Sequence, residues 1–292
     1  MIRRHFLAAA ALPAMAQSNR AKFKLRYGPH PAMFRNLAGE DVIDQIKFSA
    51  DQGFTGWEDN GANKRPPGEQ TKIGEALAKA GMMMGVFVAF GDFANTDFVT
   101  RTDKEYREFL KGRMRDAVEV SKRVGAKWTT VVPNAVNNKI DPNYQTANCI
   151  TNLKAMAEVC EPSGLVMVLE PLNWYANHPG LFLRTVPQAY AICKGVGSPS
   201  CKILDDLYHQ QIDCGNLIPN LEKAWDEIAY VQVGDNPGRK EPTTGEINYR
   251  KIFEWLHKKG FDGVVGMEHG NSKPGKDGEL AVIAAYRESD NF

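Results

Sequence analysis

From residue 24 to the end of the chain, short runs of hydrophobic residues alternate with segments whose hydrophobic residues recur at helical spacing. Short apolar runs are typical of strands buried on both faces of a parallel sheet. They predict eight strands, at residues 24–28, 54–58, 82–90, 128–132, 165–170, 202–206, 230–234 and 263–268. Because eight runs recur at regular intervals, the pattern predicts parallel strands joined by crossover helices.

A segment with apolar residues at helical spacing follows each strand. In one of them Tyr106, Leu110 and Met114 lie on one face, and Gly125 ends the helix. The predicted helices cover residues 39–53, 71–81, 106–124, 146–160, 185–194, 217–228, 249–259 and 277–287.

Eight strand–helix units fit either a closed barrel or an open doubly wound sheet. An open sheet that binds a nucleotide has a glycine-rich turn after its first strand. Gly28 is followed instead by Pro29, His30 and Pro31, which cannot cradle a pyrophosphate. The sequence therefore favours an α/β fold with a single (β/α)8 TIM barrel.

Composition narrows the class of protein. Of the 292 residues 43% are hydrophobic and 24% charged, which are ordinary proportions for a globular protein. The formal net charge is +1 and no basic block stands out, so we expect no nucleic-acid partner.

The first sixteen residues form a separate unit. Arg3 and Arg4 precede an apolar run that ends Ala14-Met15-Ala16, which is the pattern of a secretory signal peptide. The paired arginines indicate the twin-arginine route. The run is too short to cross a bilayer, so we expect no stable membrane anchor. We therefore expect a signal peptide at residues 1–16, a barrel at 17–292, and an exported, periplasmic protein, or a cytoplasmic one if the leader is not processed.

Polar side chains end four consecutive strands, the fifth to the eighth. They are Glu170, Asp206, Gln232 and Glu268. In a β/α barrel the carboxyl ends of the strands form the active site, so these groups should converge. Carboxylates packed closely repel one another unless a cation neutralises them. Oxygen ligands of this kind suit Mg²⁺ or Mn²⁺.

Several short motifs carry a family resemblance. They are Glu-Pro-Leu-Asn at 170–173, Asp-x-Tyr-His at 206–209, Val-Gln-Val-Gly-Asp-Asn-Pro-Gly-Arg at 231–239 and Thr-Gly-Glu-Ile-Asn-Tyr at 244–249. In this order they resemble the hydroxypyruvate isomerase branch of the xylose isomerase-like TIM barrels, over residues 24–292.

The resemblance implies roles for residues that match the motifs. Glu170, Asp206, Gln232 and Glu268 match the four metal ligands, with Gln232 where many relatives have His. His209 matches a histidine that contacts substrate, and its spacing favours Asp206 over Asp205 as the ligand. The resemblance further implies that Arg239 binds the far end of the substrate.

Two further side chains stand near these motifs. Trp174 follows the first motif, and its aromatic face suits a wall of a sugar pocket. Glu58 closes the second strand, and its place fits a contact with substrate as well as a structural role.

The chemistry expected of such a site is proton transfer next to a carbonyl. A divalent cation stabilises a cis-enediolate, while Glu170 and Glu268 flank the substrate to remove and return the proton. The resemblance implies an isomerase acting on hydroxypyruvate or a similar small hydroxy-carbonyl compound.

Other functions stay open at this stage. Export favours an extracellular keto-sugar or ketoglycoside, handled by epimerisation or elimination. An abasic-site nuclease would need more histidines and a basic track, and a non-catalytic sugar-binding barrel would lack one of the paired glutamates. Relatives often pair, so a homo-oligomer is compatible with the sequence.

Overall fold

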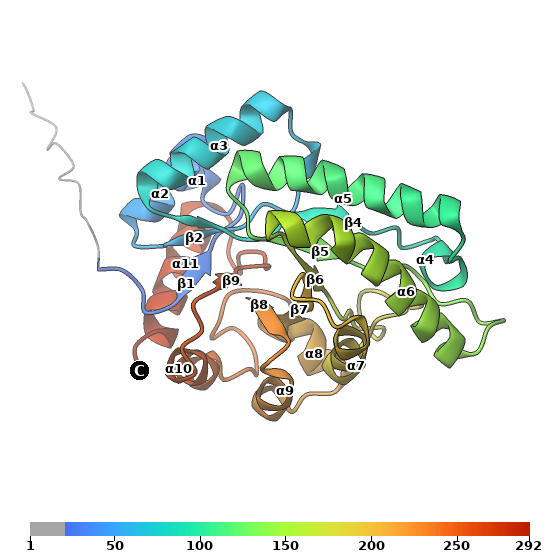
Figure 1. Cartoon of the computed structure of the whole chain (residues 1–292). Helices are drawn as coiled ribbons and strands as arrows, with labels where there is room; N and C mark the ends of the chain where they lie inside the picture. Colours follow the sequence, from blue (N-terminus) through green and yellow to red (C-terminus); the bar gives the residue numbers. More distant parts are fainter. Residues whose placement is uncertain (1–20) are drawn as a thin grey trace, which may run out of the picture.

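The computed structural model describes residues 21–292, so the predicted signal peptide lies outside the described residues. Nine strands occupy the centre of the molecule (Figure 1). They are β1 (Arg26–Gly28), β2 (Gly56–Trp57), β3 (Met83–Met84), β4 (Val88–Phe90), β5 (Trp128–Val131), β6 (Val166–Leu169), β7 (Cys201–Asp206), β8 (Ile228–Gln232) and β9 (Val264–Gly266).

All strand pairs are parallel, and the first strand lies beside the last. One sheet has the order β1-β9-β8-β7-β6-β5-β4, and β2 pairs with β3. Strands β3 and β4 are two parts of the single strand predicted at 82–90. Single hydrogen bonds continue the circle: Glu58 N–H donates to Pro29 O (2.9 Å), and Val88 N–H to Asn60 O (3.2 Å). The closed barrel is thus confirmed, since an open sheet would keep its two edge strands apart.

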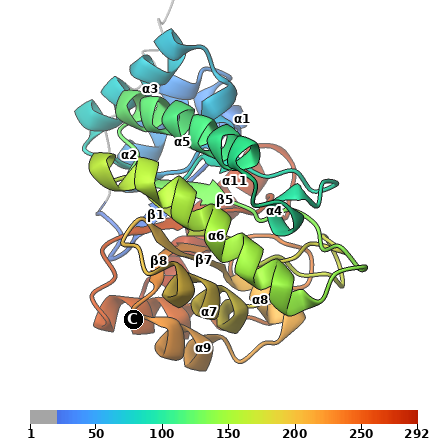
Figure 2. The same ribbon diagram turned by 45° about the vertical axis from the view of Figure 1, so that its right-hand side comes forward.

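Helices cover the outside of the strands, as Figure 2 shows for α3, α5, α6 and α7. They are α1 (Arg35–Ala38), α2 (Val42–Asp51), α3 (Pro67–Ala80), α4 (Asp97–Thr100), α5 (Lys104–Val124), α6 (Pro142–Cys160), α7 (Val186–Val196), α8 (Leu207–Asp213), α9 (Leu217–Ala224), α10 (Tyr249–Lys258) and α11 (Gly275–Ser289), with 3-10 turns at Ala62–Lys64 and Glu161–Ser163. Three short helices, α1, α4 and α8, lie where the sequence pattern predicts none. Helix α9 ends four residues earlier than expected, because β8 already begins at Ile228.

Local signals explain where the long helices begin and end. Asp103 accepts a hydrogen bond from the backbone N–H of Tyr106 and so caps the start of α5 (3.0 Å). Gly125 ends that helix with a left-handed φ of 72°. Among the described residues, no helix is both long enough and apolar enough to cross a membrane.

The interior of the barrel is closed below the site by an apolar layer. The buried members of this cluster are Val86, Trp128, Val168, Leu204, Tyr230 and Val264. Because side chains alternate along a strand, the residue two places after an inward-facing one also faces inward. Glu170, Asp206 and Gln232 each stand two places after a member of this layer. The same alternation turns Asp205 outward, so Asp206 is the aspartate at the mouth.

Candidate active site

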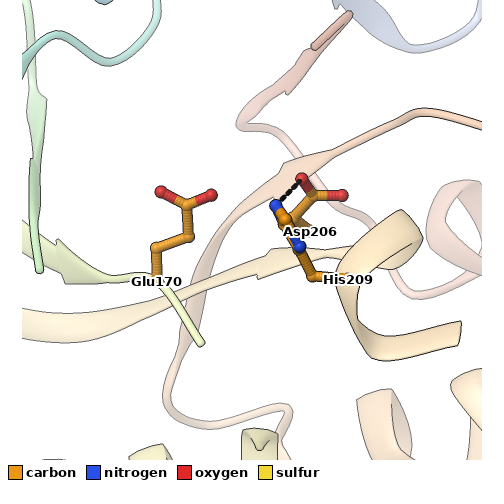
Figure 3. Close-up of side chains that lie close together, drawn as sticks. All are labelled: Glu170, Asp206 and His209. Atoms are coloured by element: carbon orange, nitrogen blue, oxygen red, sulfur yellow. Dashed lines mark ion pairs between the residues drawn. The ribbon is translucent and has the colours of Figure 1, made fainter. Parts of the chain in front are cut away.

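The four polar side chains predicted to converge follow or end the neighbouring strands β6 to β9. Asp206 and Gln232 are register partners across β7 and β8, and Gln232 is the partner of Gly266 on β9. Figure 3 shows that Glu170 and the Asp206–His209 pair project to the same side of the strands. The barrel therefore brings these positions to one rim.

Glu170, Asp206 and His209 form the centre of the site. Each offers a ligand atom, and these atoms all lie within 4.8 Å of one another. All three residues are buried. Burial, followed by the charge of Asp206, raises the pKa of Glu170 to about 8. Burial alone would raise the pKa of Asp206 too, but His209 and Arg239 hold it below its usual range.

Arg239 lies between two of the predicted metal ligands. Its Nη2 donates to Asp206 Oδ2 and to Glu268 Oε2, both at 2.8 Å. Glu268 also accepts a hydrogen bond from the amide of Asn60 (3.2 Å). Burial and then the charge of Glu170 raise the pKa of Glu268 well above its ordinary value, against the pull of Arg239. In this structure the guanidinium is thus the counter-ion of the carboxylates.

Gln232 is held by a carboxylate beneath the rim. Its Nε2 donates to Glu58 Oε1 (3.0 Å), and Tyr230 donates its hydroxyl proton to Glu58 Oε2 (2.7 Å). Since the amide nitrogen is committed to Glu58, the amide oxygen must face the other way. This amide oxygen, Gln232 Oε1, is buried and has no hydrogen-bond partner among the described residues. Burial raises the pKa of Glu58 to about 7, although both hydrogen bonds lower it.

The orientation of His209 is set by Asn173. Two backbone N–H groups, those of Ala176 and Asn177, donate to Asn173 Oδ1 (2.9 and 3.2 Å) and fix which end of the amide faces the ring. Asn173 Nδ2 therefore donates to His209 Nδ1 (2.6 Å). Burial lowers the pKa of His209 to about 4, so the neutral ring carries its proton on Nε2. That N–H lies 3.4 Å from Asp206 Oδ2. In this orientation His209 presents a donor at Nε2.

The loop that carries Arg239 is fixed by one buried aspartate. Asp235 accepts hydrogen bonds from the backbone N–H groups of Gly245 (2.8 Å) and Ile247 (3.1 Å). Gly245 is required because a Cβ there would lie 2.2 Å from Asn236 O. These contacts support the left-handed backbone of Arg239, whose φ of 51° costs a non-glycine residue about 1 kcal/mol. Two of the family-like motifs are thus two halves of one loop.

A divalent cation fits the donor set that remains. Two carboxylates and an unpaired amide oxygen are hard oxygen ligands. The unpaired Gln232 Oε1 is the observation that favours a cation, because a buried acceptor without a partner costs about 1–3 kcal/mol. Glu268 would complete this set if Arg239 released it. Glu170, Asp206, Gln232 and Glu268 would hold the ion.

Two residues predicted to contact substrate, Trp174 and Arg239, make contacts within the chain in this structure. Trp174 donates its indole N–H to Leu181 O (2.7 Å), and the guanidinium of Arg184 lies over its ring (4.2 Å from Cζ to the ring centroid). Both contacts are with the segment that follows β6. Arg239 contacts the carboxylates of Asp206 and Glu268.

Sequence reasoning missed Asn173 and Tyr230 and left the role of Glu58 open. Tyr230 stands two places before Gln232 on the same strand face, which is the signal that could have found it.

Comparison with known proteins gives the family. A family model described as xylose isomerase-like TIM barrel matches residues 46–288. A 2-oxo-tetronate isomerase of Cupriavidus necator is 31% identical over 177 residues, covering 61% of this chain and 67% of that protein. The hydroxypyruvate isomerase of Escherichia coli is 34% identical over 123 residues, covering 42% of this chain and 47% of that protein. The match to the Escherichia coli protein thus spans only about half its length.

The fold also matches solved structures. A family 2 AP endonuclease from Brucella melitensis superposes with a TM-score of 0.74 at 22% identity, covering 90% of this chain and 99% of that one. At this identity the likeness concerns the fold.

Proposed function

The chain belongs to the xylose isomerase-like TIM barrel family, and we propose that it is an isomerase that requires a divalent cation and interconverts a small hydroxy-carbonyl compound. One observation carries the proposal. Two glutamates, Glu170 and Glu268, meet an aspartate and an unpaired amide oxygen at the rim of a closed barrel. The names of the matched relatives, a hydroxypyruvate isomerase and a 2-oxo-tetronate isomerase, support the same class of reaction.

The cation would be Mg²⁺ or Mn²⁺, because the available ligands are oxygens. When bound, the cation would supply a Lewis acid for the negative charge that develops during proton transfer. Glu170, Asp206, Gln232 and Glu268 would hold it. The Asn173 contact leaves His209 to donate its Nε2 proton in a hydrogen bond to a substrate oxygen.

The two glutamates are suited to move a proton between neighbouring carbons. A base that works near neutral pH needs a pKa near the working pH, and burial raises the pKa of Glu170 to about 8. No described group donates a hydrogen bond to the Glu170 carboxylate, so it is free to take a proton. Glu268, held by Asn60 and Arg239, would face the substrate from the other side.

Arg239 selects the substrate. Its guanidinium can pair with the carboxylate of an acidic substrate such as hydroxypyruvate once it leaves Asp206 and Glu268. A neutral keto-sugar or ketoglycoside is the second candidate, favoured by the export that the leader at residues 1–16 indicates. Epimerisation, isomerisation and elimination share the enediolate, so they require the same residues.

A nuclease and a non-catalytic binding barrel are less well supported. Within residues 21–292 one cluster of three metal-ligating side chains is present, with a single histidine that the hydrogen bonds make a donor. A binding barrel would not need two glutamates with raised pKa values.

A proton-exchange experiment tests the proposal. With Mn²⁺ present, the wild-type protein should wash deuterium into hydroxypyruvate, a ketose or a 3-keto-glycoside. Glu170→Gln and Glu268→Gln should each lower that rate by a factor of about 100 or more. Glu119→Gln changes an exposed glutamate on α5 and serves as the matched control. Undiminished exchange in both site variants would refute the roles of the glutamates.

Metal content separates the classes of function. About one Mg²⁺ or Mn²⁺ for each chain supports the isomerase, and loss of the ion on Asp206→Ala locates it. Several zinc ions would indicate a nuclease, and no ion a binding protein. Sedimentation of the same sample gives the oligomeric state.

A further inference from the structure

A large cleft opens beside the carboxylates, over the carboxyl ends of β4 and β5. Its volume is about 810 Å³. It lies between the segment after β2, the segment after β4, and the helices α4 and α5, which Figure 1 shows at one side of the barrel. Pockets of roughly 300–1,000 Å³ suit ligands far larger than a three-carbon acid. A small hydroxy-carbonyl compound therefore leaves this cleft unfilled.

Two contacts join the cleft to the candidate active site. Asn60 lines the cleft and donates its amide N–H to Glu268 Oε1 (3.2 Å). On another side, His178 packs against His209 (5.3 Å between ring centroids) and against Phe93 (5.2 Å). Phe93 directly follows Gly91 and Asp92, which line the cleft. Asn60 thus belongs both to the lining of the cleft and to the surroundings of Glu268.

The lining of the cleft suits a neutral sugar ring. Phe109 is 53% exposed and stacks on Tyr106 (5.9 Å, 28° between ring planes), which gives an aromatic face to the solvent. Aromatic faces pack well on the C–H surface of a ring. Amide side chains supply donors and acceptors, from Asn60, Asn63, Asn95 and Asn134. The amide oxygens of Asn60 and Asn63 are buried and have no partner among the described residues.

The charges of the cleft cancel. Three basic side chains line it, those of Lys64, Arg101 and Arg113, and three acidic ones, those of Asp92, Asp97 and Glu105. A site for a phosphate or a uronate would carry an excess of basic groups. The balance favours a neutral ligand.

We infer that this cleft binds a second, non-reacting sugar ring, so that the preferred substrate is a neutral keto-glycoside whose keto ring reaches Glu170 and Glu268. The inference rests on the proposed function, and it names the substrate class for that site. Phe109 is the key side chain, because it provides the ring-stacking face and makes no contact with the carboxylates.

Two substrates that differ only in the second ring test the inference. The KM for proton exchange is measured with 3-ketosucrose and with methyl 3-keto-α-D-glucopyranoside. Phe109→Ala should raise the KM for 3-ketosucrose about fivefold to tenfold and leave the KM for the methyl glycoside unchanged. Phe109→Trp, which keeps an aromatic face, should restore the wild-type ratio. Tyr144→Ala removes another exposed aromatic side chain, outside the cleft, and should change neither value.

A binding measurement keeps this inference separate from the proposed function. Sucrose itself, which carries no keto group, is observed by saturation-transfer NMR with the wild-type protein and with Phe109→Ala. Loss of the sucrose signal in Phe109→Ala supports the sugar site even if no compound undergoes exchange, in which case the proposed function fails alone. Equal sucrose signals, or equal KM ratios in both proteins, overturn the inference.

Discussion

Replacement of Glu58 by Gln would reverse the amide that we expect to face the cation. The ionised Glu58 carboxylate of the wild-type protein can only accept, so Gln232 turns its nitrogen toward it (3.0 Å) and its oxygen away. A glutamine at position 58 can donate as well as accept. Its amide would then compete for the Gln232 oxygen and leave an N–H group, which cannot ligate a metal, at the rim.

The size of the effect follows from two terms. Loss of a hydrogen bond to a charged group costs about 1.5–3 kcal/mol, and this is the preference that holds Gln232 in one orientation. Groups that orient a metal ligand typically contribute a factor of about 10–100 in metal affinity. We therefore expect Glu58→Gln to raise the Mn²⁺ dissociation constant about 10- to 100-fold while the barrel stays folded.

Titration calorimetry with Mn²⁺ measures this constant directly, without substrate. Tyr230→Phe is the matched control, because it removes the other hydrogen bond to Glu58 (2.7 Å) but leaves Gln232 its acceptor. It should change the dissociation constant by less than about threefold, since the Gln232 orientation is retained. If Glu58→Gln binds Mn²⁺ as the wild-type protein does, Glu58 does not orient Gln232 and the assigned ligand set is wrong.

Four further outcomes are expected. Arg239→Ala should destabilise the metal-free protein by about 2 kcal/mol, because Asp206 and Glu268 lose their shared partner. Mn²⁺ should restore the melting temperature of this variant. Equal melting curves of the variant and the wild-type protein in EDTA would contradict this. Burial raises the pKa of Glu170 to about 8, so folding favours its protonated form, and the free energy of unfolding that this group contributes below pH 4.5 should be lost as the pH rises toward about 8. Calorimetry in EDTA measures the melting temperature over this range. A melting temperature that rises with pH would contradict the assignment. Gly245→Ala should displace the Arg239 loop and raise KM for hydroxypyruvate more than tenfold, whereas Gly68→Ala, at an open helix position, should not. Lysine at positions 3 and 4 should block export through the twin-arginine route, checked by cell fractionation, and unchanged export would refute the assigned leader.

Much of the fold was predictable because two periods dominate the sequence. Strands and helices alternate with lengths that fit a barrel, and the strand predicted at 202–206 lies within β7 (Cys201–Asp206). Strand 82–90 was harder, since its continuous apolar run conceals an interruption between β3 and β4. Helix α8 has only seven residues and lies directly after β7, so it is too short for an apolar stripe that would predict a separate helix.

The rim positions were predictable for a similar reason. A polar side chain at the carboxyl end of an apolar strand lies at the mouth of the barrel when it faces inward. The orienting groups were less visible, because an orienting group acts across strands far apart in sequence. Glu58 and Gln232 are separated by 174 positions, and only the closed barrel makes them neighbours.

Glycine at position 266 explains how that pair fits inside the barrel. A Cβ at Gly266 would lie 1.9 Å from Glu58 Oε2, so any other residue there would push the carboxylate from its place. Glu58 cannot simply swing away, because Tyr230 and Gln232 hold both of its oxygens. Strand β9 therefore has a glycine at the level of the site, and the Glu58 carboxylate that orients Gln232 occupies the space that a side chain would fill. The rim of the site is thus determined as much by one absent side chain as by the polar groups that line it.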